Sequence, residues 1–258
     1  MMRLKMTAGW VTAGLATIGL ASLLGTSAAM AGDTRAVYEL FTSQGCSSCP
    51  PADKLAAELA RRPDTVVLSM PVDYWDYLGW KDTLASPAFT KRQKAYAAAR
   101  GDRNVYTPQI VVNGLVHVVG SDNDALAIAT KDAGARDGVL DAAVAITPSG
   151  DGFTVAIDKA PGLRGEVWLM ATESKAEVAI GRGENSGHSI TYTNVVRSMT
   201  KIGDYTGDAV KIPVKGSVIG SDGVDGFAVL VQSVQDGKPG AILGAATHSP
   251  LQRMAQPG

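Results

Sequence analysis

The stretch that decides the fold is residues 36–53, AVYELFTSQGCSSCPPAD, which holds both cysteines of the chain, Cys46 and Cys49, at C-x-x-C spacing. The apolar, alternating run at 37–41 predicts a strand, and the helical spacing of apolar residues at 52–59 predicts a helix. The free N–H groups and positive dipole end at the start of a helix favour a thiolate. A thiolate attacks disulfides, and a second thiol one turn on resolves the mixed disulfide. The stretch therefore predicts a redox site.

Composition restricts the class of protein. A chain of 258 residues accommodates one large domain or two ordinary ones. The formal net charge is -1 with 19% charged residues and no basic block, so we do not expect a nucleic-acid partner. A hydrophobic content of 45% suffices for a packed core.

Residues 1–31 have the pattern of a signal peptide. Arg3 and Lys5 precede an apolar or small-residue run at 6–24, and Ala29-Met30-Ala31 supplies a small-x-small cleavage pattern. The alternative is an uncleaved membrane anchor. No later run approaches the roughly 18 apolar residues needed to span a bilayer. We therefore expect an exported protein, periplasmic or extracellular, without membrane contact after cleavage and in a compartment where a disulfide persists.

Residues 33–138 are predicted to form an α/β domain with a mixed sheet flanked by helices. Ser86-Pro87 predicts the start of a second helix, and Gly101 predicts its end. Asn113-Gly114 predicts a two-residue hairpin turn. The first two strands, joined by a helix, should be parallel and the last two antiparallel. The expected elements are a strand to 41, a helix from 52, a strand at 65–72, a helix at 87–100, strands at 109–112 and 115–119, and a helix at 124–131.

Residues 139–258 are predicted to form a second, smaller domain. Short alternating runs are separated there by clusters of Gly, Asp, Pro and Ser, such as residues 148–152. Seven or eight such strands without helices are typical of a small antiparallel β-sandwich. The expected strands are 142–147, 153–157, 166–172, 177–181, 189–196, 210–214, 227–234 and 241–246.

The N-terminal half resembles a known fold. Its element order, its C-x-x-C at the first helix and Thr107-Pro108 before the hairpin are similar to thioredoxin, and TPQIVVNGLVHVVGSD resembles the matching segment of glutaredoxins. The resemblance implies a cis peptide bond at Pro108, packed beside the cysteines. It also implies that the Thr107 backbone is free to pair with an incoming peptide strand. The alternative is an ordinary proline at the start of a strand.

Several motifs together resemble one family, the secreted thioredoxin-like family catalogued as domain of unknown function twelve-twenty-three. These motifs are GCSSCPPAD, VDYWDYLGWKD, RQKAY, YTPQ with VVNG, and RGENSGHSITYTNVVR. The resemblance implies the fold and export, whereas the family carries no assigned activity. Gly45 stands where thioredoxin has a tryptophan, and Ser47 and Ser48 lie between the cysteines. Their hydroxyls either donate to a Cys46 thiolate or cap the helix.

Two carboxylates lie near the motif, and one of them, Glu39, is a candidate for proton transfer. Glu39 alternates with the apolar residues of the first strand, so it is expected beneath the cysteines. There it could accept the proton of Cys49 when the mixed disulfide resolves. The alternative for Glu39 is an ion pair with a nearby Arg or Lys. Asp53 is expected to stabilise the start of the helix, where negative charge is favourable.

Aromatic residues are expected at the same sheet edge as the cysteines. Tyr74 and Trp75 follow the second strand, and Tyr106 precedes Thr107, so we predict that they line a substrate groove. Trp80 is expected to cover the core. The helix residues Arg92, Gln93 and Tyr96 are candidates for hydrogen bonds to the loop at 73–80. The polar loop 182–188 either docks on the redox domain, contacts the substrate, or is a hairpin turn.

The two cysteines could also serve a metal site or a structural disulfide. A zinc site takes four ligands, and the chain offers two cysteines and three separated histidines, so no metal is predicted. Copper(I) is the stronger metal alternative because thiolates are soft ligands. A structural disulfide across so short a loop gains little entropic stabilisation. We therefore expect a thiol–disulfide oxidoreductase for protein or small-molecule thiols, with a redox-active Cys46–Cys49 disulfide and no cofactor. The alternatives are a copper(I)-handling module and a non-catalytic binding protein.

Overall fold

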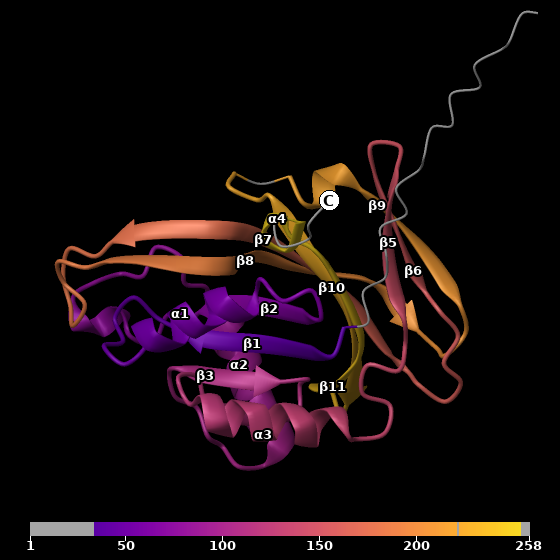
Figure 1. Ribbon diagram of the computed structural model, residues 1–258, viewed down its shortest axis with the longest axis horizontal. Helices are drawn as coiled ribbons and strands as arrows, with labels where there is room; N and C mark the ends of the chain where they lie inside the picture. Colours follow the sequence, from indigo (N-terminus) through magenta and orange to yellow (C-terminus); the bar gives the residue numbers. More distant parts are fainter. Residues whose placement is uncertain (1–33, 221, 254–258) are drawn as a thin grey trace, which may run out of the picture.

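The chain forms an eight-stranded mixed sheet with helices packed on it and a separate three-stranded antiparallel sheet (Figure 1). The computed structural model describes residues 34–220 and 222–253, so the predicted signal peptide lies outside the described residues. Within these ranges no helix is both long enough and apolar enough to cross a membrane. The elements are β1 Ala36–Thr42, α1 Pro50–Leu59, β2 Thr65–Pro71, η1 Asp76–Leu78, α2 Pro87–Arg100, β3 Gln109–Val112, β4 Val116–Val119, α3 Asn123–Gly134, β5 Val144–Ser149, β6 Gly152–Ile157, β7 Gly165–Ala179, β8 Ser189–Tyr205, β9 Val210–Lys215, η2 Gly216–Val218, β10 Gly226–Gln235, β11 Lys238–His248 and α4 Pro250–Arg253.

The N-terminal half has the predicted order of elements. β1 pairs with β2 in parallel and with β3 antiparallel, and β3 and β4 form the predicted hairpin. The strand order in this part of the sheet is therefore β2-β1-β3-β4. Ser86 caps α2 by accepting the Ala88 N–H, and Gly101 ends it at a φ of 77°. These two signals placed both ends of the helix correctly.

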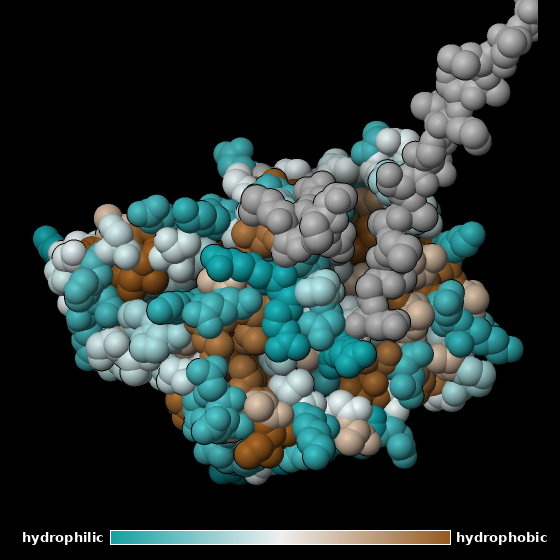
Figure 2. Space-filling model, in the orientation of Figure 1, coloured by the Kyte–Doolittle hydropathy of each residue, from teal (hydrophilic) through white to brown (hydrophobic). Residues whose placement is uncertain are grey.

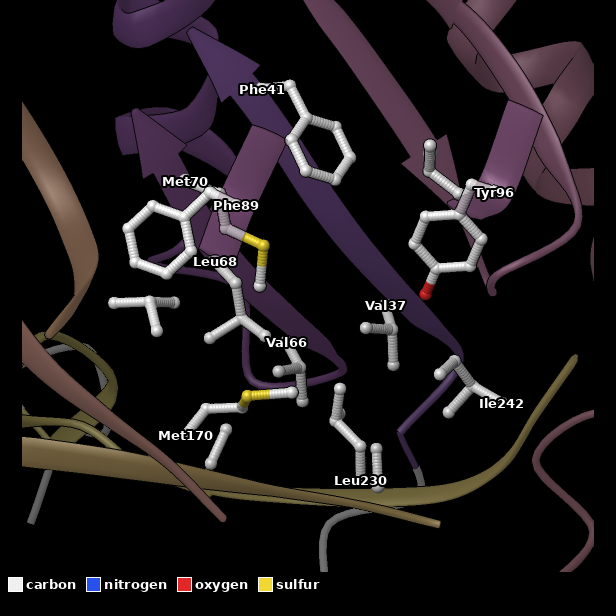
Figure 3. Packing of buried hydrophobic residues seen from close by; sticks show 14 of the residues in the cluster. Val37, Phe41, Val66, Leu68, Met70, Phe89, Tyr96, Met170, Leu230 and Ile242 are labelled. Carbon is white, nitrogen blue, oxygen red and sulfur yellow. The ribbon is translucent and has the colours of Figure 1, made fainter. Parts of the chain in front are cut away.

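β1 is buried along its whole length because helices cover both faces of the sheet. Tyr38 and Leu40 face a cluster that includes residues of α1 and α3. Val37 and Phe41 face the opposite cluster, where Tyr96 of α2 and strands of the C-terminal half meet them (Figure 3). The alternation of side chains along a strand assigns each residue of β1 to one of these two cores.

The C-terminal half does not form a sheet system of its own. β8 pairs in parallel with β2 at Ser69 and Val195, so β11-β10-β7-β8 extend the N-terminal sheet to eight strands. The Ser69 hydroxyl donates to the Thr193 carbonyl at 2.7 Å across this junction. Met170 and Leu230 pack with residues of β1 and β2 (Figure 3). The expected independent sandwich is thus replaced by a shared sheet, because β2 offers an unpaired edge that β8 covers.

The three-stranded sheet, ordered β5-β6-β9, packs on the other part of the large sheet. Its buried face shares a second cluster with β7, β10 and β11, in which the rings of Phe153 and Phe227 stack at 4.2 Å. The small sheet therefore packs on strands of the eight-stranded sheet, and the predicted separate β-sandwich domain is not what these strands form. On the face shown in Figure 2, apolar residues form separate patches between hydrophilic ones.

β7 and β8 are longer than predicted and form a two-stranded arm that passes β2 and α1 (Figure 1). Irregular pairing between Val167 and Trp168 and between Ala171 and Thr172 interrupts the alternation that a sequence pattern relies on. The expected strands 166–172 and 177–181 are consequently one strand. The turn that joins the arm's strands, residues 180–188, is called the β7–β8 tip below.

Candidate redox site

Cys46 and Cys49 form a disulfide at the start of α1. Cys49 is the N-cap residue, and Pro50 and Pro51 begin the helix. Proline is tolerated there because N–H groups in the first turn make no hydrogen bond within the helix. Helix therefore starts directly after the motif, two residues before the predicted start at 52. The two cysteines are 1% and 0% exposed. The disulfide thus lies just beneath the surface, under the turn that joins its two residues.

Ser47 and Ser48 form that exposed turn. The Ser48 hydroxyl lies 3.4 Å from the Cys46 sulfur, a hydrogen-bonding distance for sulfur. Neither hydroxyl caps α1, since Cys49 at the N-cap has no side-chain hydrogen bond. Of the two predicted roles, the contact with the Cys46 sulfur is the one that the geometry supports for Ser48. A hydroxyl in this position would stabilise a Cys46 thiolate.

The Thr107–Pro108 peptide bond is cis, as the resemblance implied. Trp75 connects this bend to the cysteine turn. Its indole N–H donates to the Thr107 hydroxyl at 2.8 Å, and its Cβ lies against Gly45, where an added Cβ would approach it to 3.0 Å. Pro108 is buried close to the first turn of α1, since both it and Ala52 border Gly120. The bend and the C-x-x-C turn therefore lie on one edge of the sheet.

The other two aromatic candidates have different surroundings. Tyr74 is half-buried beside Trp75, their ring centroids 6.3 Å apart, and burial raises the pKa of its hydroxyl. Tyr106 is also half-buried, but its hydroxyl bonds the Nδ1 atom of His117 on β4 at 2.8 Å. Burial raises the pKa of Tyr106 and lowers the pKa of His117. Trp75 is therefore the aromatic residue that contacts the motif, while Tyr106 is engaged with the neighbouring strand.

Glu39 is not free to serve the cysteines. Its side chain is fully buried, and Arg92 of α2 donates from Nε to its Oε1 at 2.6 Å. The Tyr96 hydroxyl, which points into the core in Figure 3, donates to its other oxygen. Glu39 lies on the α2 face of β1 with Val37 and Phe41, whereas α1 covers the opposite face. The expected proton-acceptor position is thus corrected to the alternative, a buried ion pair.

Asp53 takes the position that was expected of Glu39. It lies four residues after Cys49, and its N–H donates to the Cys49 carbonyl at 3.1 Å, so both side chains lie on one face of α1. Asp53 is 2% exposed, and neither of its oxygens has a hydrogen-bond partner among the described residues. Burial raises the pKa of this carboxyl from 3.8 to about 8. Asp53 is therefore a protonated acid at neutral pH, not a helix-stabilising anion.

Polar groups from three segments surround Asp53. Thr42 at the end of β1 offsets part of the pKa rise, and the buried Asp82 adds to it. Asp82 accepts the Gln44 N–H at 2.7 Å, and its own pKa is raised by burial. Tyr192 of β8 is fully buried nearby, and its pKa is raised by burial and by the two aspartates. A residue of the C-terminal half therefore borders the acid behind the disulfide.

The β7–β8 tip docks directly on the cysteine turn. The buried Asn185 amide donates to the carbonyls of Gln44 and Cys46, both at 2.9 Å. Glu184 accepts the Ser47 N–H at 3.1 Å, and hydrogen bonding from Ser47 lowers the pKa of this carboxyl. Loop 182–188 is thus the predicted hairpin turn, and the contacts of Glu184 and Asn185 also support the predicted docking. The sequence showed a polar loop, but not that Asn185 reaches backbone atoms about 140 positions away.

The remaining candidates have mainly structural contacts. Trp80 is half-buried, packs beside Ile180 of the tip, and donates to the Gln44 side chain at 2.8 Å, as expected of a covering residue. Gln93 donates to the Tyr106 carbonyl at 2.8 Å, while Arg92 and Tyr96 turn to Glu39. On the same helix, the Thr90 hydroxyl accepts the Asp73 N–H and donates to the Asp73 carboxylate. Across residues 34–220 and 222–253, no group of three or more His, Cys, Asp or Glu side chains is placed to hold a metal ion.

Fold and site together define an α/β protein with a C-x-x-C disulfide at a helix start, covered by an arm of the same sheet. The model of the family "protein of unknown function (DUF1223)" matches residues 37–232, and the chain belongs to this family. It is also similar to the X-ray crystal structure of a structural genomics target from Agrobacterium tumefaciens. The two share 33% identity with a TM-score of 0.75, over 84% of this chain and 94% of the other. No match is found among curated proteins.

Proposed function

We propose that the protein is an exported, thioredoxin-like thiol–disulfide oxidoreductase whose reactive group is the Cys46–Cys49 disulfide. The observation that carries the proposal is a disulfide at the N-terminus of α1 with a cis-proline bend linked to it through Trp75. The order β2-β1-β3-β4 supports a thioredoxin-like fold for residues 36–134. The small-x-small pattern at residues 29–31 and the disulfide itself support export.

Cys46 is the proposed site of attack. It precedes the helix, and its sulfur contacts the Ser48 hydroxyl. A substrate thiolate forms a bond to the Cys46 sulfur, and the bond between the Cys46 and Cys49 sulfurs breaks. Cys49 leaves with the electron pair of that bond. The positive end of α1 and the Ser48 hydroxyl stabilise Cys46 when it becomes the thiolate in the later step.

Asp53 is the proposed proton donor to Cys49. Its pKa of about 8 keeps it protonated at neutral pH, and it lies one turn from Cys49 on the same helix face. The proton passes from the Asp53 carboxyl to the departing Cys49 sulfur. A second substrate thiolate then attacks the substrate sulfur bound to Cys46 and releases the Cys46 thiolate. The substrate leaves as a disulfide, and the protein has gained two electrons.

The same steps in reverse reduce a substrate disulfide. The Asp53 carboxylate then accepts the proton of Cys49 while the Cys49 sulfur displaces the substrate sulfur from Cys46. The Thr107 backbone beside the cis-proline is the proposed pairing site for an extended substrate peptide, since its side chain, not its backbone, bonds Trp75.

The proposal is tested with single cysteine variants of the exported protein. We expect Cys46→Ser to be inactive in insulin reduction with dithiothreitol as electron source. Cys49→Ser should retain Cys46 and accumulate mixed disulfides with substrates, which non-reducing electrophoresis and mass spectrometry detect. Equal activity of both variants and the wild type would exclude the proposed chemistry. The reduction potential of the couple, measured against glutathione, assigns the direction of electron flow.

A further inference from the structure

A cavity that the redox chemistry does not use opens between α2 and strands β7, β8 and β10, with the β10–β11 turn at its margin. Its volume is about 370 Å³, within the lower range of small-molecule sites. Much of its wall is apolar and comes from the C-terminal half, including Trp168, Met199, Val234 and Pro239. The ring and aliphatic surfaces of these residues suit the apolar body of a small ligand.

Arg92 brings a fixed positive group to this cavity. Its side chain is 9% exposed, and Nε is held by Glu39 at 2.6 Å. Nη2 donates to the Tyr96 hydroxyl at 2.8 Å and to the Gln232 side chain at 2.9 Å. Among the described residues no hydrogen bond uses Nη1. The guanidinium is thus locked in one orientation with one donor group unused, the arrangement in which arginine recognises carboxylates and other planar anions.

The other charges around the cavity are also positive on balance. Lys91 and Lys238 are exposed at its margin. The one acid in its lining, Glu166, is bound by Lys201 at 2.8 Å, a lysine that it shares with Asp204, and by the Trp168 indole N–H at 3.1 Å. The lining residues Lys91 and Lys238 therefore outnumber it. The charge of Arg92 is balanced by Glu39, so the two lysines give the cavity its net positive field. An anion is therefore the complementary ligand.

We propose that this cavity binds a small organic anion, with a carboxylate or sulfonate group on an apolar or aromatic body. The anionic group lies at Arg92 between Lys91 and Lys238, and the body lies against Trp168 and Met199. The site is built from both halves of the chain, since α2 supplies the arginine and β7, β8 and β10 supply the wall. Neither cysteine lines the cavity, and binding there needs no redox step.

Two fluorescent probes with the same ring system test the proposal. They are 8-anilinonaphthalene-1-sulfonate, which is anionic, and N-phenyl-1-naphthylamine, which is neutral. We expect the anionic probe to bind the full-length exported protein at one site, at least about tenfold more tightly than the neutral probe. Energy transfer from tryptophan to the bound probe reports binding, and the variants below locate the probe. Equal affinities for the two probes would overturn the proposal.

Cavity-filling and charge variants locate the bound probe. Ala95→Phe fills the cavity and should weaken binding of the anionic probe at least about tenfold, whereas Ala98→Phe, exposed on the same helix, should leave it unchanged. Lys91→Glu and Lys238→Glu should each weaken the anionic probe about three- to tenfold without weakening the neutral one. Far-ultraviolet circular dichroism confirms that each variant is folded. Undiminished binding to folded Ala95→Phe places the probe elsewhere and refutes the site.

Discussion

Replacing Asp53 by asparagine should remove a pH dependence from the stability of the protein. In the folded chain burial raises the Asp53 pKa from 3.8 to about 8. The folded state therefore keeps a proton that the unfolded state has released between these pH values, so stability falls as pH rises from about 4 to about 8 and is level above. At about 1.36 kcal/mol per pKa unit, the loss is on the order of 5 kcal/mol.

The assay is urea unfolding followed by circular dichroism at intervals from pH 4 to pH 9, with the disulfide intact. We expect Asp53→Asn to lack this decline and to exceed the wild type in unfolding free energy at pH 9 by several kcal/mol. Asp124→Asn, at an exposed position in the first turn of α3, is the control and should follow the wild type. Parallel curves for the wild type and Asp53→Asn would refute the assignment of a buried, protonated carboxyl.

Three further substitutions test other contacts by the same unfolding assay. Asn185→Ala leaves two backbone carbonyls without their donor, so we expect a loss of about 2–3 kcal/mol and faster reduction of the disulfide by dithiothreitol; unchanged rate and stability would contradict tip docking. Gly114→Ala places a Cβ 2.2 Å from a carbonyl oxygen of β11. Its control is Gly101→Ala, at a glycine that also has a positive φ but whose added Cβ meets nothing within 4 Å. Gly114→Ala should therefore lower the unfolding free energy by at least about 2 kcal/mol more than the control does. Glu39→Gln leaves the buried Arg92 guanidinium without its counter-charge, so we expect the unfolding free energy to fall by about 3–5 kcal/mol. A fall of less than about 1 kcal/mol, as for a surface ion pair, would contradict the buried ion pair.

Local signals predicted most of the N-terminal half. Ser86-Pro87 and Gly101 predicted the two ends of α2, and the Asn-Gly pair predicted the β3–β4 turn. Each of these signals acts within a few residues, through a missing N–H, a side-chain cap or a positive φ. The extent of β7 and β8 was not predicted because bulges interrupt their alternation.

The parts of the site that were not predicted depend on which helix covers a given face of the sheet and on which segment docks at its edge. Alternation gave Glu39 a buried position, but it did not say that α2 rather than α1 covers that face of β1. Asp53 did carry a usable signal, since it shares its helix face with the buried Ala52 and Ala56. A carboxylate within an apolar helix stripe indicates a buried acid. Asn185 carried no such signal, because its partners are backbone carbonyls, which every residue has.

The parallel pairing of β8 with β2 makes the N-terminal half, which holds the C-x-x-C turn, dependent on the rest of the chain. A fragment ending after α3 would expose the edge of β2, Thr65–Pro71, a strand that is buried along its whole length in the complete chain and is mostly apolar. An exposed strand edge pairs with strands of neighbouring molecules, so the fragment should aggregate instead of folding as a soluble unit. A transfer of the cysteine turn to another protein would therefore have to include strands β7 and β8 as well.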